Sequence, residues 1–214
     1  MVRPHLRRPA IVAFAVAAAV AVVLAIAPGA TAQPAVEYSD GAPHNARLTI
    51  PTIGIKQLTV IAYRGKTDDA PGTRIQNRGI AASPYGPHGG VGPGGLGNYQ
   101  VTAHRTSHGG VFRRTPSVGN GTLVYVDAGS WRYVYEVIKT RWVSFRSAES
   151  LRKQRAPVPG HPGKSPHRGY ITISTCATPE DHAAGNFWTD RFGNPEHRID
   201  KIGVLVKRVA NPHA

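Results

Sequence analysis

The chain has 214 residues, which is enough for one domain of ordinary size with appendages. It carries 26 basic against 12 acidic side chains, a formal net charge of +14, but these charges are scattered along the sequence. That distribution argues against specific nucleic-acid binding and favours anionic headgroups and wall polymers as electrostatic partners. The single cysteine excludes an internal disulfide and any zinc site that needs two or more thiolates.

The N-terminal segment has the pattern of an export signal or a membrane anchor. Three arginines and no acid in the first nine residues precede an uninterrupted apolar run of 18 residues, 10–27. Ala30-Thr31-Ala32 has the form of a cleavage site, so retention and cleavage both remain open. Either way, the basic flank predicts that the rest of the chain lies outside the cytoplasm. The expected organisation is an anchor or signal segment at 1–32, a linker at 33–46, a catalytic domain at 47–210 and a tail at 211–214.

Short runs of β-branched and aromatic residues, separated by Gly and Pro, predict a β fold. One helix is expected behind a Ser147 cap, ending near Arg155. We expect turns and loops over 66–96, with room for one helical turn, and a 21-residue connection at 177–197 that is long enough to be functional. The expected fold class is all-β, a closed barrel of seven to eight strands with one or two short helices. The predicted strands are 47–55 (broken at Pro51), 57–63, 98–104, 122–126, 131–145 (bent or bulged), 171–176 and 198–207.

Two reactive side chains occupy equivalent places in this pattern. Alternation along 171–176 puts Thr172, Ser174 and Cys176 on one face, so the thiol lies at a strand end among polar groups. Alternation along 98–104 places His104 in the same way. A thiolate is the nucleophile in cysteine chemistry, and an imidazole can activate it or protonate a leaving amine. Periodicity alone also allows a half-buried thiol without a chemical role.

Three motifs in order resemble those of the sortases, the cysteine transpeptidases that attach proteins to bacterial cell walls. Residues 172–176, Thr-Ile-Ser-Thr-Cys, resemble the family's Thr-Leu-x-Thr-Cys strand, and residues 103–106, Ala-His-Arg-Thr, resemble its histidine motif. The Ile-Pro-x-Ile-Gly-Ile core of 47–55 is similar to the usual first strand, and the N-terminal segment fits as well. The resemblance covers residues 47–208.

The resemblance implies that Cys176 attacks the Thr–Gly bond of a Leu-Pro-x-Thr-Gly-like sorting signal and forms a thioacyl intermediate. His104 would protonate the departing amine, and Arg198 would bind the substrate carbonyl or the oxyanion. The connection between cysteine and arginine is longer than is common in the family, which makes Arg191 a rival for Arg198. The further candidates for substrate contacts are Thr175, Arg105, Phe187 and Trp188.

The composition most resembles that of class E sortases, whose preferred signal is similar to Leu-Ala-x-Thr-Gly. The implied partners are surface proteins with C-terminal sorting signals, a peptidoglycan precursor or another amine acceptor, and the membrane through the N-terminal segment. No cofactor or metal is expected, since Glu149 is the only acid in the variable loop 146–168 where class A enzymes bind calcium.

Three alternatives remain open from the residues. One is a Cys-His peptidoglycan hydrolase. Such an enzyme usually has a third polar group that orients the histidine, and the sequence shows no strong candidate for a group orienting His104. Another is a non-catalytic binding module of the envelope. The last is a metal site built from Cys176, Asp181, His182 and His197, although their spacing follows no common zinc pattern.

Overall fold

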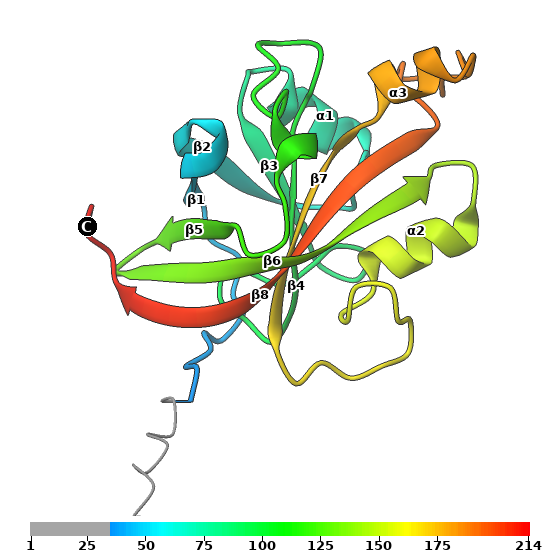
Figure 1. Ribbon diagram of the computed structural model, residues 1–214. Helices are drawn as coiled ribbons and strands as arrows, with labels where there is room; N and C mark the ends of the chain where they lie inside the picture. The colour runs from blue at the N-terminus through cyan, green and yellow to red at the C-terminus, as the bar shows by residue number, and fades with distance from the viewer. Residues whose placement is uncertain (1–34) are drawn as a thin grey trace, which may run out of the picture. The chain divides into compact units, whose positions relative to one another are not determined.

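The computed structural model describes residues 35–214, which form a closed eight-stranded β-barrel with three short α-helices and two 3₁₀ turns (Figure 1). This confirms the predicted all-β barrel. The strands are β1 (Ala46–Ile50), β2 (Ile55–Arg64), β3 (Ala81–Tyr85), β4 (Gly97–Thr102), β5 (Leu123–Ala128), β6 (Trp131–Ser144), β7 (Gly169–Cys176) and β8 (His197–Ala210). The helices are η1 (Pro51–Ile53), α1 (Ala70–Gln76), η2 (Thr115–Ser117), α2 (Ala148–Arg155) and α3 (Thr178–Ala183). Around the barrel the strand order is β1-β2-β3-β4-β7-β8-β6-β5.

Strand alternation fills the barrel with apolar side chains. Tyr99 and Val101 of β4 and Ile171 and Ile173 of β7 belong to one buried cluster, together with Tyr135 of β6. Burying these side chains supplies the main stabilising free energy of the barrel. It also fixes the strand register, because a shift of one residue would turn every apolar side chain outward.

The register around β7 places the two strand ends that matter for the site. β7 pairs in parallel with β4 and antiparallel with β8, so that Thr102 lies opposite Ser174 and Arg198 lies opposite Cys176. β4 ends at Thr102, and His104 follows two residues beyond the strand. α1 and α3 lie near the end of the barrel where β7 stops (Figure 1).

Several local predictions are confirmed. The predicted strands 122–126 and 131–145 correspond to β5 and β6, which Gly129-Ser130 joins as a two-residue hairpin turn. The pairing of β6 with β8 shifts register twice, as expected for a bulged strand. Ser147 caps α2, its Oγ accepting a hydrogen bond from the Ser150 backbone N–H at 3.1 Å.

The prediction for 66–96 was wrong in one respect: the segment holds α1, where one helical turn was expected, but it also holds β3, which was not expected. Pro84 favoured a turn because proline cannot donate to a ladder. In β3, Pro84 lies opposite Tyr63 in the parallel pairing with β2, while β4 pairs with β3 only at Ala82–Thr102. Pro84 therefore lies beyond the short ladder to β4. The 177–197 connection likewise contains α3, which the sequence analysis did not anticipate.

The segment 1–32, predicted to be an anchor or signal, lies outside the described residues. Within residues 35–214, no helix is both long enough and apolar enough to cross a membrane. The start of the described chain contacts the barrel, because Val36 and Tyr38 pack against the core and the Ser39 backbone N–H donates to the Gly94 carbonyl at 2.9 Å.

The polar face of β7 and β8 is buried beneath the end of α2. The Gln154 carboxamide, which is fully buried, donates to Ser174 Oγ at 3.2 Å and to Asp200 Oδ1 at 3.0 Å, and it accepts from Thr67 Oγ1 at 3.1 Å. The second oxygen of Asp200 is buried without a partner among the described residues. Burial raises the pKa of Asp200 to about 6.

Asp200→Asn is expected to stabilise this protein at pH 8 by up to about 3 kcal/mol, because the asparagine avoids the cost of a buried charge. Folding raises the pKa of Asp200 from its ordinary value of 3.8 to about 6, so the folded protein takes up this proton at a higher pH than the unfolded chain. The gain should therefore shrink as the pH falls from 6 and vanish near pH 4. Urea denaturation of wild type and variant across this range measures the difference.

Asp127 offers a control of opposite sign. It is buried, and the hydrogen bonds from Arg132 and Gln57 keep its pKa low in spite of burial. Asp127→Asn should therefore destabilise the protein at pH 8 and lose that effect as the pH falls. Equal pH dependence in the two variants would contradict the assignment for Asp200.

Candidate active site

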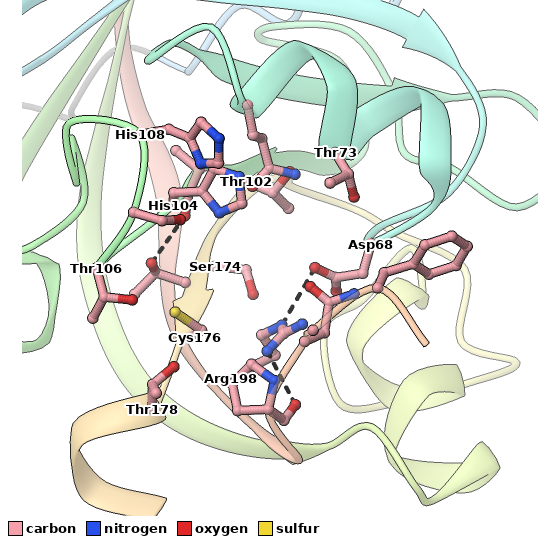
Figure 2. Close-up of a pocket in the computed structure, with 18 of the residues that line it drawn as sticks. Asp68, Thr73, Thr102, His104, Thr106, His108, Ser174, Cys176, Thr178 and Arg198 are labelled. Atoms are coloured by element: carbon pink, nitrogen blue, oxygen red, sulfur yellow. Dashed lines mark hydrogen bonds and ion pairs between the residues drawn. The ribbon is translucent and has the colours of Figure 1, made fainter. Parts of the chain in front are cut away.

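One cavity of about 210 Å³ brings together the three residues that the sequence analysis placed in the reaction (Figure 2). Cys176, His104 and Arg198 all line it, although they come from β7, from the segment after β4 and from β8. α1 forms another wall, through Thr73, Gln76 and the following Asn77. The cavity lining is mostly polar.

Cys176 is the last residue of β7 and is partly exposed, so that a substrate can reach its thiol. Thr175 lines the same cavity, but its Oγ1 donates to the Ala103 carbonyl at 2.9 Å. This bond ties the cysteine strand to the residue that precedes His104. Thr175 thereby holds the two reactive segments together and has no free hydroxyl hydrogen for a substrate.

His104 lies beside Asn77 and His108. Its Nε2 is 2.7 Å from Asn77 Oδ1. Its ring stacks on that of His108 with centroids 4.9 Å apart, and Figure 2 shows the two rings side by side. Burial, His108 and Arg198 together lower the pKa of His104, while Asp68 acts in the opposite direction. His104 is therefore neutral over more of the physiological range than an exposed histidine.

The Arg198 side chain is 3% exposed and is fixed on several sides. Its Nε donates to Asp68 Oδ1 at 3.3 Å, its Nη1 donates to the carbonyls of Pro195 and His197, and its guanidinium lies 5.0 Å from the centre of the Phe145 ring. Nη2 makes no hydrogen bond to any residue in the described part of the chain. Arg198 thus presents a charged donor in a defined orientation.

The rival arginine is placed differently. Arg191 is exposed, its guanidinium lies 4.7 Å from the centre of the Phe192 ring, and it does not line the cavity. The long connection contributes to the cavity wall farther along, through residues 192–195.

The remaining residues proposed for substrate contacts lie outside this cavity. Arg105 is mostly buried and forms a bidentate ion pair with Glu180 of α3, and it also donates to the Cys176 carbonyl at 3.2 Å. Phe187 is 69% exposed and contacts His182, whereas Trp188 lies under the Arg146 guanidinium. Arg105 therefore holds α3 against the cysteine strand, and the two aromatic side chains cover a different part of the surface.

The geometry also brings in residues that sequence reasoning missed. Asn77 contacts His104, and Asp68 contacts Arg198. Both come from the segment 66–96, where mainly loops were expected. His108, which stacks on His104, follows the histidine motif closely in sequence. The only local signal was the position of His108, four residues after His104. For metals, no group of three or more possible ligands is present among residues 35–214. In the same part of the chain, His197 Nδ1 and Asp181 Oδ1 pair directly at 2.6 Å.

Comparison with known proteins decides the family. The Sortase domain family model matches residues 48–192, more than half of the chain. The chain belongs to the sortase family. This sortase is thus a member of a family of cysteine transpeptidases, and the matched stretch includes His104 and Cys176 but ends before Arg198. A search of curated proteins finds no match.

Solved sortases share the fold of this one. The SrtA sortase from Actinomyces oris aligns with a TM-score of 0.60 and 22% identity, covering 86% of this chain and 92% of that chain. Sortase E1 from Streptomyces coelicolor, solved with a tripeptide in its active site, aligns with a TM-score of 0.57 and 20% identity, covering 81% and 94%. Sortase E from Streptomyces avermitilis aligns with a TM-score of 0.56 and 19% identity, covering 81% of this chain and 93% of that chain.

Proposed function

We propose that this sortase cleaves a Leu-Pro/Ala-x-Thr-Gly-like sorting signal between Thr and Gly and transfers the acyl group to an amine of the cell wall. The observation that carries the proposal is the meeting of Cys176, His104 and Arg198 in one cavity. A nucleophile, an acid–base group and a fixed cation are the parts that acyl transfer through a thioester needs.

In the proposed reaction the Cys176 thiolate attacks the threonine carbonyl carbon, and the carbonyl oxygen becomes an oxyanion that Arg198 stabilises. When the C–N bond breaks, His104 gives a proton to the departing glycine amine. The acyl group is then held on sulfur as a thioester. In the second half the incoming amine attacks this thioester, His104 takes up a proton, and the thiolate leaves.

The class and the location belong to the same proposal. The Streptomyces sortases E among the structural neighbours support a class E enzyme and a Leu-Ala-x-Thr-Gly-like signal. The basic and apolar N-terminal sequence supports a catalytic domain outside the cell, held at the membrane or released after cleavage. Domain bounds of 47–210 for the catalytic part, with a linker at 33–46, are proposed on the same pattern.

Hydrolysis is the second candidate, because the bond between His104 and Asn77 supplies the orienting polar group that a Cys-His hydrolase wants. In that case water takes the place of the amine acceptor. The two reactions share the thioacyl intermediate and differ only in its fate.

Full-length protein incubated with a library of sorting-signal peptides is expected to form a covalent adduct on Cys176, with release of the peptide's glycine-containing end. Mass spectrometry reads both products. Adding an amine such as triglycine should convert the released acid into an amide if transfer is the reaction. No adduct with any peptide would contradict the transpeptidase proposal, and acid as the only product despite added amine would support hydrolysis.

A further inference from the structure

A carboxylate that the proposed chemistry does not require lies next to Arg198. Asp68, in the turn between β2 and α1, lines the cavity, and its side chain is 9% exposed. Its Oδ1 accepts the hydrogen bond from Arg198 Nε at 3.3 Å (Figure 2). Asp68 and Arg198 therefore form a buried ion pair at the edge of the reactive centre.

Two features make the position of Asp68 costly. Its backbone φ is +62°, in the left-handed region, which is unfavourable for a residue with a Cβ although aspartate adopts it more often than most. Its Oδ2 is buried and has no hydrogen-bond partner among the described residues. Neither cost is offset by local structure, since it is the neighbouring Asp69 that caps α1. Arg198 is the hydrogen-bonded cation that compensates these costs, and Arg155 adds an electrostatic attraction. Strained residues concentrate at functional sites.

The hydrogen bonds of Arg198 show what this pair achieves. Two backbone carbonyls hold Nη1, whereas Asp68 is the one side chain that holds Nε. With Nε and Nη1 occupied, the planar guanidinium can turn little, and Nη2 is the donor left for a substrate. Without Asp68, one edge of the guanidinium would be free.

The charge of Asp68 acts on His104 as well. Burial, His108 and Arg198 all lower the pKa of His104, and Asp68 alone among the contributing groups raises it. His104 must carry a proton when the amine departs, so a carboxylate that balances Arg198 favours the required imidazolium.

We propose that Asp68 is a positioning residue of this sortase: its carboxylate fixes the Arg198 guanidinium for the oxyanion and balances the arginine charge beside His104. The proposal rests on the proposed transpeptidase function, in which Arg198 and His104 take part. Asp68 itself touches no reacting atom.

Other charged groups face the two residues and must be considered in any test. The groups whose ionisation Asp68 influences are Tyr63 of β2, Arg155 of α2, His104 and Asp200 of β8. The groups that influence His104 are His108, Arg198 and Asp68. Asp68 is the only acid in that second set.

Two variants of Asp68 separate geometry from charge. Asp68→Ala removes both and is expected to lower kcat/KM for a processed peptide by about tenfold to a hundredfold, mostly through kcat. Asp68→Asn lacks the charge but keeps an oxygen that can accept a hydrogen bond from Arg198 Nε. At its pH optimum, its kcat/KM should therefore fall much less than that of Asp68→Ala. Asp68→Asn should also lower the pKa of His104, which an NMR titration of the imidazole measures without any substrate.

A double-mutant cycle tests whether Asp68 acts through Arg198. In an Arg198→Ala background, Asp68→Ala should cost less than about threefold, measured as single-turnover formation of the acyl-enzyme. Asp69→Asn is the matched control, because this neighbouring acid accepts from Gly72 N and Lys66 N and has no contact with Arg198. Its effect should be the same in both backgrounds.

The results that would overturn the proposal are distinct from failure of the proposed function. If wild-type protein acylates peptides but the loss from Asp68→Ala is equal in both backgrounds, Asp68 does not position Arg198. If Asp68→Asn leaves the His104 titration unchanged, the charge-balancing role is wrong, whatever the activity. Should Asp68→Ala fail to fold, Asp68→Gly carries the cycle, because glycine also removes the carboxylate and adopts the positive φ without strain, and Asp68→Asn still carries the titration. Absence of acylation in the wild type would instead contradict the proposed function.

Discussion

Cys176→Ala is expected to abolish acyl-enzyme formation and to reduce turnover of a sorting-signal peptide at least about a thousandfold. The thiol is the sole cysteine sulfur of the chain, so no other thiolate can replace it. Its position at the end of β7 is partly exposed, and alanine fits the same strand conformation. The free energy of unfolding should therefore change by less than about 1 kcal/mol.

Peptide turnover followed by chromatography, with urea denaturation of the same samples, measures both quantities. His182→Ala provides a control on α3, because this histidine contacts Phe187 outside the cavity and should retain full turnover. Turnover by Cys176→Ala within tenfold of the wild type would refute the covalent mechanism. Loss of activity together with loss of folding would show instead that Cys176 is structural.

The sequence predicted the barrel well because its main determinant is local. Alternation along 171–176 places Ile171 and Ile173 inside the barrel, and the structure confirms it. The opposite face carries the polar side chains of Thr172 and Ser174 but is also buried, and Ser174 accepts a hydrogen bond from Gln154 of α2. A polar side chain in a strand indicates a hydrogen-bonded environment, and the sequence does not show whether water or Gln154 provides it.

The partners of the reactive residues could not be predicted, since they depend on long-range packing. Asp68 and Asn77 flank α1, a helix of seven residues that contains Pro71 and Gly72 and has no clear helical pattern. The route of the chain from β2 to β3 brings this helix against the cavity. No periodicity within 66–96 encodes that placement, which follows from the parallel pairing of β2 with β3.

The choice between the two arginines shows what strand register adds. Arg191 lies within the long connection after Cys176, and Arg198 follows directly after that connection. Proximity in sequence to Cys176 therefore does not decide between them. The antiparallel pairing of β7 with β8 sets Arg198 directly opposite Cys176. Register is a property of two strands together, so the sequence of either strand alone leaves it undetermined.

Arg198→Ala is expected to lower kcat/KM for a processed peptide by about a hundredfold to a thousandfold, the usual effect of removing an oxyanion donor. Arg191→Ala should change it by less than about twofold, because that side chain is exposed and outside the cavity. The kcat/KM of Arg198→Lys should lie between those of Arg198→Ala and Arg191→Ala, since an ammonium keeps the charge but lacks the planar set of guanidinium donors. Steady-state kinetics on the three variants decide the assignment, and an equal loss in Arg191→Ala would reverse it.

The stability of the same variants gives an independent check. Arg198→Ala leaves the Asp68 carboxylate buried without its cation, so it should lower the free energy of unfolding by about 3 kcal/mol. Removing the carboxylate too, in the Asp68→Ala/Arg198→Ala double variant, should restore part of that stability while activity stays low. Stability would then rise without any gain in activity, which loss of folding alone cannot produce. A double variant less stable than Arg198→Ala would show that the pair is not the source of the cost.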